Sequence, residues 1–313
     1  MARPMAILSM RKIFVTGGSG FVGQHLRQLQ GSSVLDGLDV VFAPTGMDIR
    51  DRSAIVQALQ SVQPDFVIHL AAQSFVPASF KDPAETLDIN LLGTLALLQA
   101  LGEVQFKGRM LFVSSGDVYG SVPEDQLPVL ESRWPEPRNP YAVSKAAAEL
   151  LCRQFHFSEG LDVVIARPFN HIGPGQDPRF VVARLAQQFA QIQAGRRDAV
   201  LVVVNIDVSR DFSDVRDVIS AYAALLLRGL PGAVYNVGSG HSTTIRELIG
   251  MLASIAGVHP AIEVDASLLR PNEQVRMVAD VTLLRRDTGW IPRIGMQESL
   301  LDTFHYFSTE IQS

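Results

Sequence analysis

The chain has 313 residues, of which 47% are hydrophobic and 19% are charged, enough apolar material for one large α/β domain or two unequal domains. Its formal charge of -5 gives no electrostatic basis for binding nucleic acid or an anionic membrane surface. The single cysteine, Cys152, excludes a disulfide within the chain, and no apolar run reaches the ~18 residues of a membrane span, so we expect a cytoplasmic protein.

The N-terminal segment, residues 1–11, has a short apolar run but no small-residue cleavage pattern after it, and strand-like sequence begins soon afterwards. We therefore expect a disordered extension and not a signal peptide, with Met10 as a candidate alternative start.

A glycine-rich turn follows the first predicted strand, 12–16, and precedes the first helical pattern. The turn out of the strand needs a positive φ, a bound diphosphate needs backbone without Cβ atoms, and a helix N-terminus offers N–H donors to an anion. An ordinary glycine-rich turn is the alternative, but its place between the first strand and the first helix favours a dinucleotide site. The residues concerned are Gly17, Gly20, Phe21, Val22 and Gly23.

The second predicted strand, 38–43, ends in Ala43-Pro44-Thr45, with neither an acid nor an arginine at its tip. A site selective for NAD usually carries a carboxylate there. The sequence therefore does not choose between NAD and NADP. Asp48, next to Ile49, is positioned either to accept a hydrogen bond from the adenine amino group or to cap the helix that begins near Arg52.

Two further buried strands end in residues suited to a site. The strand over 65–70 runs into Leu70-Ala71-Ala72, small enough for a cofactor to approach closely, and His69 within it is expected to be a hydrogen-bonded core histidine. After a long helix over about 83–101, the strand over 109–114 ends beside Ser115, which as a donor can polarise a substrate carbonyl.

The next helix begins at Asn139-Pro140, a capping residue followed by a first-turn proline. Tyr141 and Lys145 are four residues apart, so their side chains leave the same face of this helix. The ammonium is expected to favour the phenolate and to lower the phenol pKa from its usual ~10, which would make a proton-transfer pair. Taken alone, this spacing is more often an apolar ring beside a solvated charge.

The C-terminal half contains a predicted binding loop after the strand over 161–166, with Asn170 and His171 among turn-forming residues. His171 is expected either to contact substrate or to brace the loop. In the charged stretch 207–217, Arg210 is a candidate for substrate phosphates, whereas the neighbouring charges are expected to form caps and structural pairs.

This order of strands, glycine turn, strand-tip serine and Tyr-x-x-x-Lys resembles the extended short-chain dehydrogenase/reductase superfamily, from Ile13 to about Pro292. The resemblance implies an α/β protein: a Rossmann-type doubly wound parallel sheet with a smaller C-terminal α/β substrate-binding domain, and NADP or NAD as cofactor. The dinucleotide domain would cover 12–167 and about 205–240, and the nucleotide-sugar domain about 168–204 and 241–313. The late strand 234–238 would rejoin the cofactor sheet. Helices 83–101 and 140–156 would form a four-helix homodimer interface.

The resemblance also implies roles for individual residues. Ser115, Tyr141 and Lys145 would be catalytic, with Lys145 also holding the nicotinamide ribose and Asn90 bracing the site. Besides the glycine turn, the cofactor would contact Asp48, Ile49, Leu70, Ala71, Ala72, Asn90, Tyr141 and Lys145. The substrate would contact Ser74, Ser115, Asp117, Asn170, Arg210, Arg270 and Glu273, where Arg270 and Glu273 would clamp the nucleotide diphosphate unless they form a surface ion pair.

The reaction follows from the residues after Ser115. A 4,6-dehydratase needs an acid and a base to eliminate water, whereas Gly116 leaves only Asp117 here, which favours simple reduction of a 4-keto sugar. Stretches 114–120, 166–176 and 205–212 resemble bacterial reductases of GDP-4-dehydro-6-deoxy-D-mannose, which implies a GDP-linked 4-keto-6-deoxy sugar as substrate and GDP-D-rhamnose as product. A GDP-mannose 4,6-dehydratase, another nucleotide-sugar epimerase or reductase, and a non-catalytic dinucleotide sensor are the alternatives.

Overall fold

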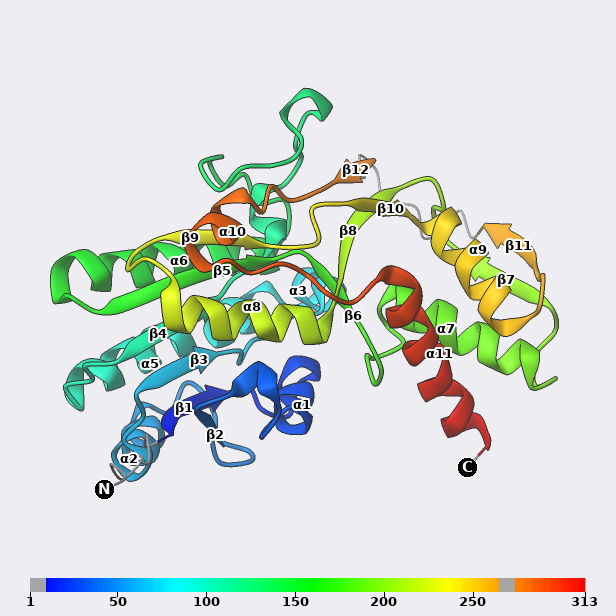
Figure 1. Ribbon diagram of the computed structural model, residues 1–313. Coiled ribbons are helices and arrows are strands. Elements are labelled where there is room, and N and C mark those ends of the chain that lie inside the picture. The colour runs from blue at the N-terminus through cyan, green and yellow to red at the C-terminus, as the bar shows by residue number, and fades with distance from the viewer. Residues whose placement is uncertain (1–9, 265–273, 313) are drawn as a thin grey trace, which may run out of the picture. The chain divides into compact units, whose positions relative to one another are not determined.

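The computed structural model describes residues 10–264 and 274–312 (Figure 1). The chain forms two compact units. The first contains the chain up to Val118 together with Pro137–Ala166 and Tyr222–Val234, and the second contains Tyr119–Glu136, Arg167–Ala221 and everything from Tyr235.

This division differs from the predicted domain boundaries for three stretches of the predicted dinucleotide domain. Residues 119–136, 205–221 and 235–240 belong to the second unit. The N–H of Val129 donates to the carbonyl of Val278, and Val129 forms a β-bridge with Ala279, which joins the first of these stretches to the C-terminal part of the chain. The functional roles given to the two domains stay predictions.

A six-stranded sheet organises the first unit, and its neighbouring strands from β2 to β5 pair in parallel. The near-continuous apolar sequences of its inner strands suit a sheet covered on both faces. The predicted return of the late strand to this sheet is confirmed by β9, which lies beside β5. In spatial order the strands are β2 (Leu38–Phe42), β1 (Arg11–Thr16), β3 (Phe66–His69), β4 (Arg109–Val113), β5 (Asp162–Pro168) and β9 (Val234–Val237). Strand β1 begins at Arg11, so the extension predicted over 1–11 is too long by one residue at least, and residues 1–9 lie outside the described chain.

Helices α2 (Arg52–Val62), α5 (Gly93–Glu103) and α6 (Pro140–Glu159) share one apolar core with alternate residues of the sheet, among them Phe14, Val67 and Phe112. The long helix predicted over 83–101 is interrupted: α4 (Pro83–Leu87) leads into the π-helical turn η2 (Asp88–Leu92) before α5 begins. The remaining helices that begin in the first unit are α1 (Phe21–Gln28) and α3 (Val76–Lys81), and α8 (Val215–Arg228) crosses the division between the units. The predicted Rossmann-type α/β class is confirmed.

Side-chain caps decide where two of these helices begin. Asn139 accepts a hydrogen bond from the N–H of Ala142 at 2.8 Å, as the sequence predicts for α6. The cap of α2 is Asp51, which accepts from the N–H of Ala54 at 3.0 Å, so the alternative that Asp48 caps this helix is wrong.

The second unit is built around β8 (Ser209–Asp214), which pairs antiparallel with β10 (Ser242–Thr244) and parallel with β6 (Asn170–Ile172) and β12 (Arg276–Met277). A separate parallel pair joins β7 (Val200–Val203) to β11 (Ala261–Val264). Helices α7 (Val181–Gln193), α9 (Ile245–Ala256) and α11 (Met296–Gln312) enclose the core of this unit, and α10 (Thr282–Thr288) lies within its C-terminal part. Over the described ranges, no helix is both long enough and apolar enough to cross a membrane.

Candidate active site

The glycine turn between β1 and α1 is shaped by two close backbone approaches. Gly17 has a φ of +74°, and a Cβ added there would lie 2.6 Å from the backbone nitrogen of Ala71. A Cβ added at Gly23 would lie 2.6 Å from Cα of Gly18. Both distances are too short for a side chain, so these glycines are required by packing. A Cβ added at Gly20 would lie 3.4 Å from its nearest neighbour, the carbonyl oxygen of Gly17. This glycine therefore leaves the outer side of the turn open.

Helix α1 starts directly after this open backbone. Its N-cap is Gly20, and no side chain caps the helix there. The first N–H groups of a helix have no partner within the helix and carry the positive end of its dipole. A turn without side chains that leads into such an N-terminus fits the diphosphate of a dinucleotide cofactor.

The strand-tip serine and the Tyr-x-x-x-Lys pair come together at the end of β4. Ser115 lies close enough to the Tyr141 phenol to affect its pKa, and the hydroxyl oxygen of Ser115 accepts a hydrogen bond from the N–H of Asp117 at 3.1 Å. One helical turn beyond Tyr141, Nζ of Lys145 donates to the carbonyl of Val113 at 2.8 Å. The three residues expected to be catalytic therefore meet within the first unit.

Burial controls the protonation of this pair. Only 8% of Tyr141 and 3% of Lys145 are exposed. Burial, reinforced by the charge of Asp117, raises the pKa of the Tyr141 phenol well above its ordinary value, and the neighbouring Ser115 hydroxyl opposes this only in part. For Lys145 the same burial acts in the opposite direction and lowers the pKa to about 8. The expectation that Lys145 brings the Tyr141 pKa down toward neutrality is therefore wrong, because desolvation of the buried phenol is the largest effect on that pKa.

Asn90 braces the start of α6 from within the π-helical turn η2. Its Oδ1 accepts from the N–H of Gln73 at 2.7 Å, and its Nδ2 donates to the Gln73 carbonyl at 3.0 Å and to Oγ of Ser144 at 2.9 Å. Ser144 in turn donates to the carbonyl of Tyr141 at 2.7 Å. A π-helical turn commonly marks a functional position, and here it places the Asn90 amide against the Ser144 hydroxyl of α6.

His69 continues this polar chain toward the glycine turn. Its Nδ1 lies 2.7 Å from Oγ1 of Thr16, and its Nε2 lies 3.0 Å from Oγ1 of Thr94. Thr94 gives its own hydroxyl proton to the carbonyl of Asn90, so it accepts from Nε2–H of a neutral histidine. Burial, with a smaller effect of the Lys145 charge, lowers the His69 pKa to about 3. The prediction of a hydrogen-bonded core histidine is confirmed.

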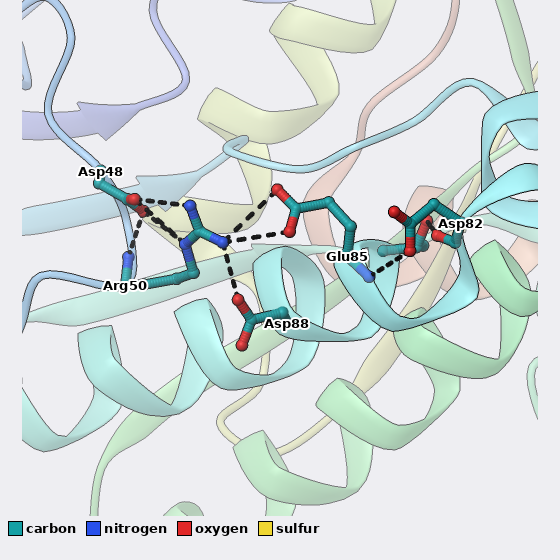
Figure 2. A network of polar contacts seen from close by, with 6 residues as sticks. Asp48, Arg50, Asp82, Glu85 and Asp88 are labelled. Atoms are coloured by element: carbon teal, nitrogen blue, oxygen red, sulfur yellow. Dashed lines mark hydrogen bonds and ion pairs between the residues drawn. The ribbon is translucent and has the colours of Figure 1, made fainter.

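The segment after β2 is held by an ion cluster around Arg50 (Figure 2). Its guanidinium donates to Asp48 at 2.7 Å, to Asp88 at 2.7 Å and to Glu85 at 3.3 Å, so the loop is tied to α4 and η2. Hydrogen bonds from Arg50 lower the Asp48 pKa to about 2. The neighbouring Ile49 is buried. Asp48 is thus held as a carboxylate, and its predicted contact with adenine stays a prediction.

The residues expected to bind substrate fall in different parts of the chain. Ser74 is exposed after β3, and Asp117 is exposed in the 3-10 turn after Ser115. Asn170 and Arg210 lie on the paired strands β6 and β8 of the second unit, where Asn170 stands opposite Phe212. Arg270 and Glu273 lie outside the described residues.

Other predicted roles in the second unit can be checked. Nδ1 of His171 lies 3.2 Å from the carbonyl of Phe169, which favours the loop-bracing interpretation. The expectation of structural pairs and caps is confirmed, because Arg216 forms an ion pair with Asp214 at 2.8 Å and Asp217 accepts from the N–H of Ile294 at 2.8 Å.

Two charged residues near the site were missed by sequence reasoning. The guanidinium of Arg27 lies over the ring of Phe42, 4.0 Å from its centroid, and that ring packs against Gly18 of the nucleotide turn. Glu149 is buried on the catalytic helix, four residues after Lys145. Only the helical spacing of Glu149 is visible in the sequence, whereas the stacking of Arg27 depends on the folded turn.

A parallel sheet with this glycine turn and a joined Ser–Tyr–Lys set defines a short-chain dehydrogenase/reductase of the extended, epimerase/dehydratase type. Residues 38–303 match the family model described as GDP-mannose 4,6 dehydratase, and the chain belongs to that family.

Individual relatives cover nearly the whole chain. It is 50% identical to the GDP-6-deoxy-D-mannose reductase of Pseudomonas aeruginosa, over 93% of this chain and 95% of that protein. The structure of RMD from Pseudomonas aeruginosa complexed with NADPH superposes with a TM-score of 0.91 at 48% identity, covering 96% of this chain and 98% of that one. The UDP-glucose 4-epimerase of Thermus thermophilus in complex with NAD gives a TM-score of 0.82 at 33% identity, with 95% and 98% covered.

The environment of His69 predicts how stability depends on pH. Because its folded-state pKa of about 3 lies below the ordinary value of 6.5, its contribution is complete above pH 6.5 and is lost as the pH falls from 6.5 toward 3, at about 1.4 kcal/mol per pH unit. His69→Gln removes this titration. In urea unfolding at pH 7.5 and pH 5, the difference in unfolding free energy between wild type and variant should shrink by about 2 kcal/mol at the lower pH. An unchanged difference would mean that His69 titrates normally.

Proposed function

We propose that this chain reduces the 4-keto group of GDP-4-dehydro-6-deoxy-D-mannose to give GDP-D-rhamnose, with NADPH or NADH as the hydride donor. The observation that carries the proposal is the placement of Ser115 beside a buried, protonated Tyr141, with Lys145 one helical turn further along α6. The 50% identity to a protein named GDP-6-deoxy-D-mannose reductase supports the same substrate.

Each of the three residues has one task in this reaction. Ser115 donates a hydrogen bond that polarises the substrate carbonyl. Tyr141, whose raised pKa keeps its proton at neutral pH, gives that proton to the oxygen as negative charge develops there. Lys145 then lies one turn away as the cation that stabilises the phenolate left behind.

Gly116 argues against the dehydratase alternative. Elimination across two carbons needs an acid for the leaving hydroxyl and a base for the proton. After Ser115 the chain offers a glycine and then the exposed carboxylate of Asp117. Reduction needs neither group, so the residues present are sufficient for it.

Replacing Tyr141 tests the proton donor. Tyr141→Phe keeps the buried ring and removes the hydroxyl, so turnover of the keto sugar should fall by about 10²–10⁴ with the fold intact. The measurement is the rate of keto-sugar-dependent NADPH oxidation, with Tyr119→Phe, which alters a buried tyrosine of the second unit, as the matched control. Activity within about tenfold of wild type would contradict the role of Tyr141.

We further infer that the cofactor site favours NADPH over NADH, because Arg27 supplies the cation that the tip of β2 lacks. Phe42 is the last residue of β2 and holds the planar guanidinium against its ring. Within the described ranges no carboxylate pairs with Arg27. A cation beside this strand tip is where a 2′-phosphate on the adenosine ribose is accommodated in this architecture.

Cofactor binding without substrate tests this inference. Arg27→Ala should weaken NADPH binding about tenfold and leave NADH binding within about twofold, since a single charge-assisted contact is lost. The dissociation constants are measured by fluorescence of the bound nicotinamide. The control is Arg52→Ala, another exposed arginine of the first unit that pairs with Glu103. Equal weakening of both cofactors would show that Arg27 acts on the fold and not on the phosphate.

We also propose a homodimer through the predicted four-helix interface. Val143, Leu150 and Phe157 recur every seven residues along α6 and are exposed, Leu150 by 62% and Phe157 by 71%. This spacing places them on one face of the helix. Leu92 is also exposed, on η2.

We also propose a cytoplasmic location. The buried free thiol of Cys152 suits a reducing compartment.

A charge among the exposed apolar residues Val143, Leu150 and Phe157 should separate the subunits. Leu150→Glu is expected to shift the molar mass measured by light scattering from dimer to monomer, because a carboxylate would be desolvated in the interface. Gln60→Glu on the exposed side of α2 introduces the same group elsewhere and should leave the mass unchanged. A monomeric wild type would refute the dimer.

A further inference from the structure

A buried carboxylate lies beneath the catalytic pair. Glu149 is 3% exposed and follows Lys145 by four residues and Tyr141 by eight, so all three side chains leave the same side of α6. The hydroxyl of Ser114, directly before Ser115, donates a hydrogen bond to Oε1 of Glu149. Burying a carboxylate costs free energy unless it is paired and hydrogen-bonded, and the reductase mechanism does not itself use this one.

The surroundings of Lys145 are poor in other charges. Its ammonium donates to the Val113 carbonyl and lies 5.1 Å from the centroid of the Phe112 ring. Cys152 and Glu149 of α6 act on its pKa, His69 of β3 is affected by its charge, and Tyr141 lies one helical turn before it on α6.

The imidazole of His69, the phenol of Tyr141 and the thiol of Cys152 are neutral near pH 7. The lowered pKa of His69 keeps its ring uncharged, and burial raises the pKa values of Tyr141 and the Cys152 thiol. Burial lowers the pKa of Lys145, and Cys152 and Glu149 act against this shift. Because the thiol stays protonated, Glu149 is the remaining group that opposes the lowering of the Lys145 pKa.

We propose that Glu149, oriented by Ser114, is a positioning residue that keeps Lys145 charged and in place beneath Tyr141 during the reaction. This inference rests on the proposed reductase function. When Tyr141 gives its proton to the substrate oxygen, a phenolate forms in a site from which water is largely excluded. A neutral Lys145 amine could not stabilise that phenolate. Glu149 therefore acts on the reaction only through Lys145.

The pH dependence of turnover tests this role. Glu149→Gln keeps the shape and the acceptor for Ser114 but removes the charge, so Lys145 should lose its proton at lower pH. The alkaline limb of kcat for keto-sugar-dependent NADPH oxidation should move by about one pH unit toward acid. The deficit of the variant should then be small at pH 6, about fivefold at pH 8 and close to tenfold above pH 9. A deficit of equal size at every pH would reduce Glu149 to a packing role and overturn the inference.

A second readout does not depend on activity. The side-chain NMR signal of Lys145, assigned by its disappearance in Lys145→Arg, should titrate about one pH unit lower in Glu149→Gln than in wild type. An unchanged titration overturns the inference even if the variant is slow. If the two proteins differ in this way but the wild type does not reduce the keto sugar, the proposed function fails and the electrostatic role of Glu149 stands.

Two control variants separate charge from structure. Cys152→Ser changes another buried group of the same helix face and should leave the alkaline limb where it is in wild type. Glu149→Asp keeps the carboxyl group, so the alkaline limb of its kcat should lie at the same pH as in wild type. The shorter side chain can still lower kcat itself. Should Glu149→Gln fail to fold, a limb that moves toward acid in Glu149→Asp, despite its retained carboxylate, would count against the proposal.

Discussion

The desolvation of Tyr141 and Lys145 is the constraint on which the site depends. Removing a phenol and an ammonium from water favours the neutral form of each, which keeps the proton on Tyr141 before the reaction and works against Lys145 as a cation. The carbonyl of Val113 and the carboxylate of Glu149 offset the second effect. Reduction of a carbonyl needs a protonated Tyr141 before the transfer and a charged Lys145 after it.

A chain of buried polar side chains fixes the position of Tyr141 and Lys145 relative to the glycine turn. It runs from Thr16, the last residue before the glycines, through His69 and Thr94 to Asn90, and from there to the first turn of α6. Every hydroxyl and ring nitrogen along it has a partner, which is the condition under which a buried polar network rigidifies a fold. The glycine turn and the catalytic helix are thereby positioned by the same set of hydrogen bonds.

Features that depend on neighbouring residues could be predicted from the sequence. The Asn139 cap, the glycine turn and the strand that ends before Ser115 are examples, because each rests on local backbone chemistry. The cap at Asp48 was wrong because Asp51, three residues on, is an equally suitable residue, and the choice is made by Arg50 and its contacts with α4 and η2. The Tyr141 pKa was wrong because spacing reveals a nearby charge but not the depth of burial. Arg27 was missed because only the folded chain brings it over Phe42.

The function proposed for this chain is the reduction of a GDP-linked 4-keto sugar. The most direct test follows absorbance of the reduced nicotinamide with purified protein, NADPH and GDP-4-dehydro-6-deoxy-D-mannose. Oxidation of NADPH that depends on the keto sugar, and is lost in Tyr141→Phe, is the predicted result. Conversion of GDP-mannose to the keto sugar without consumption of NADPH would contradict the account and identify a dehydratase instead.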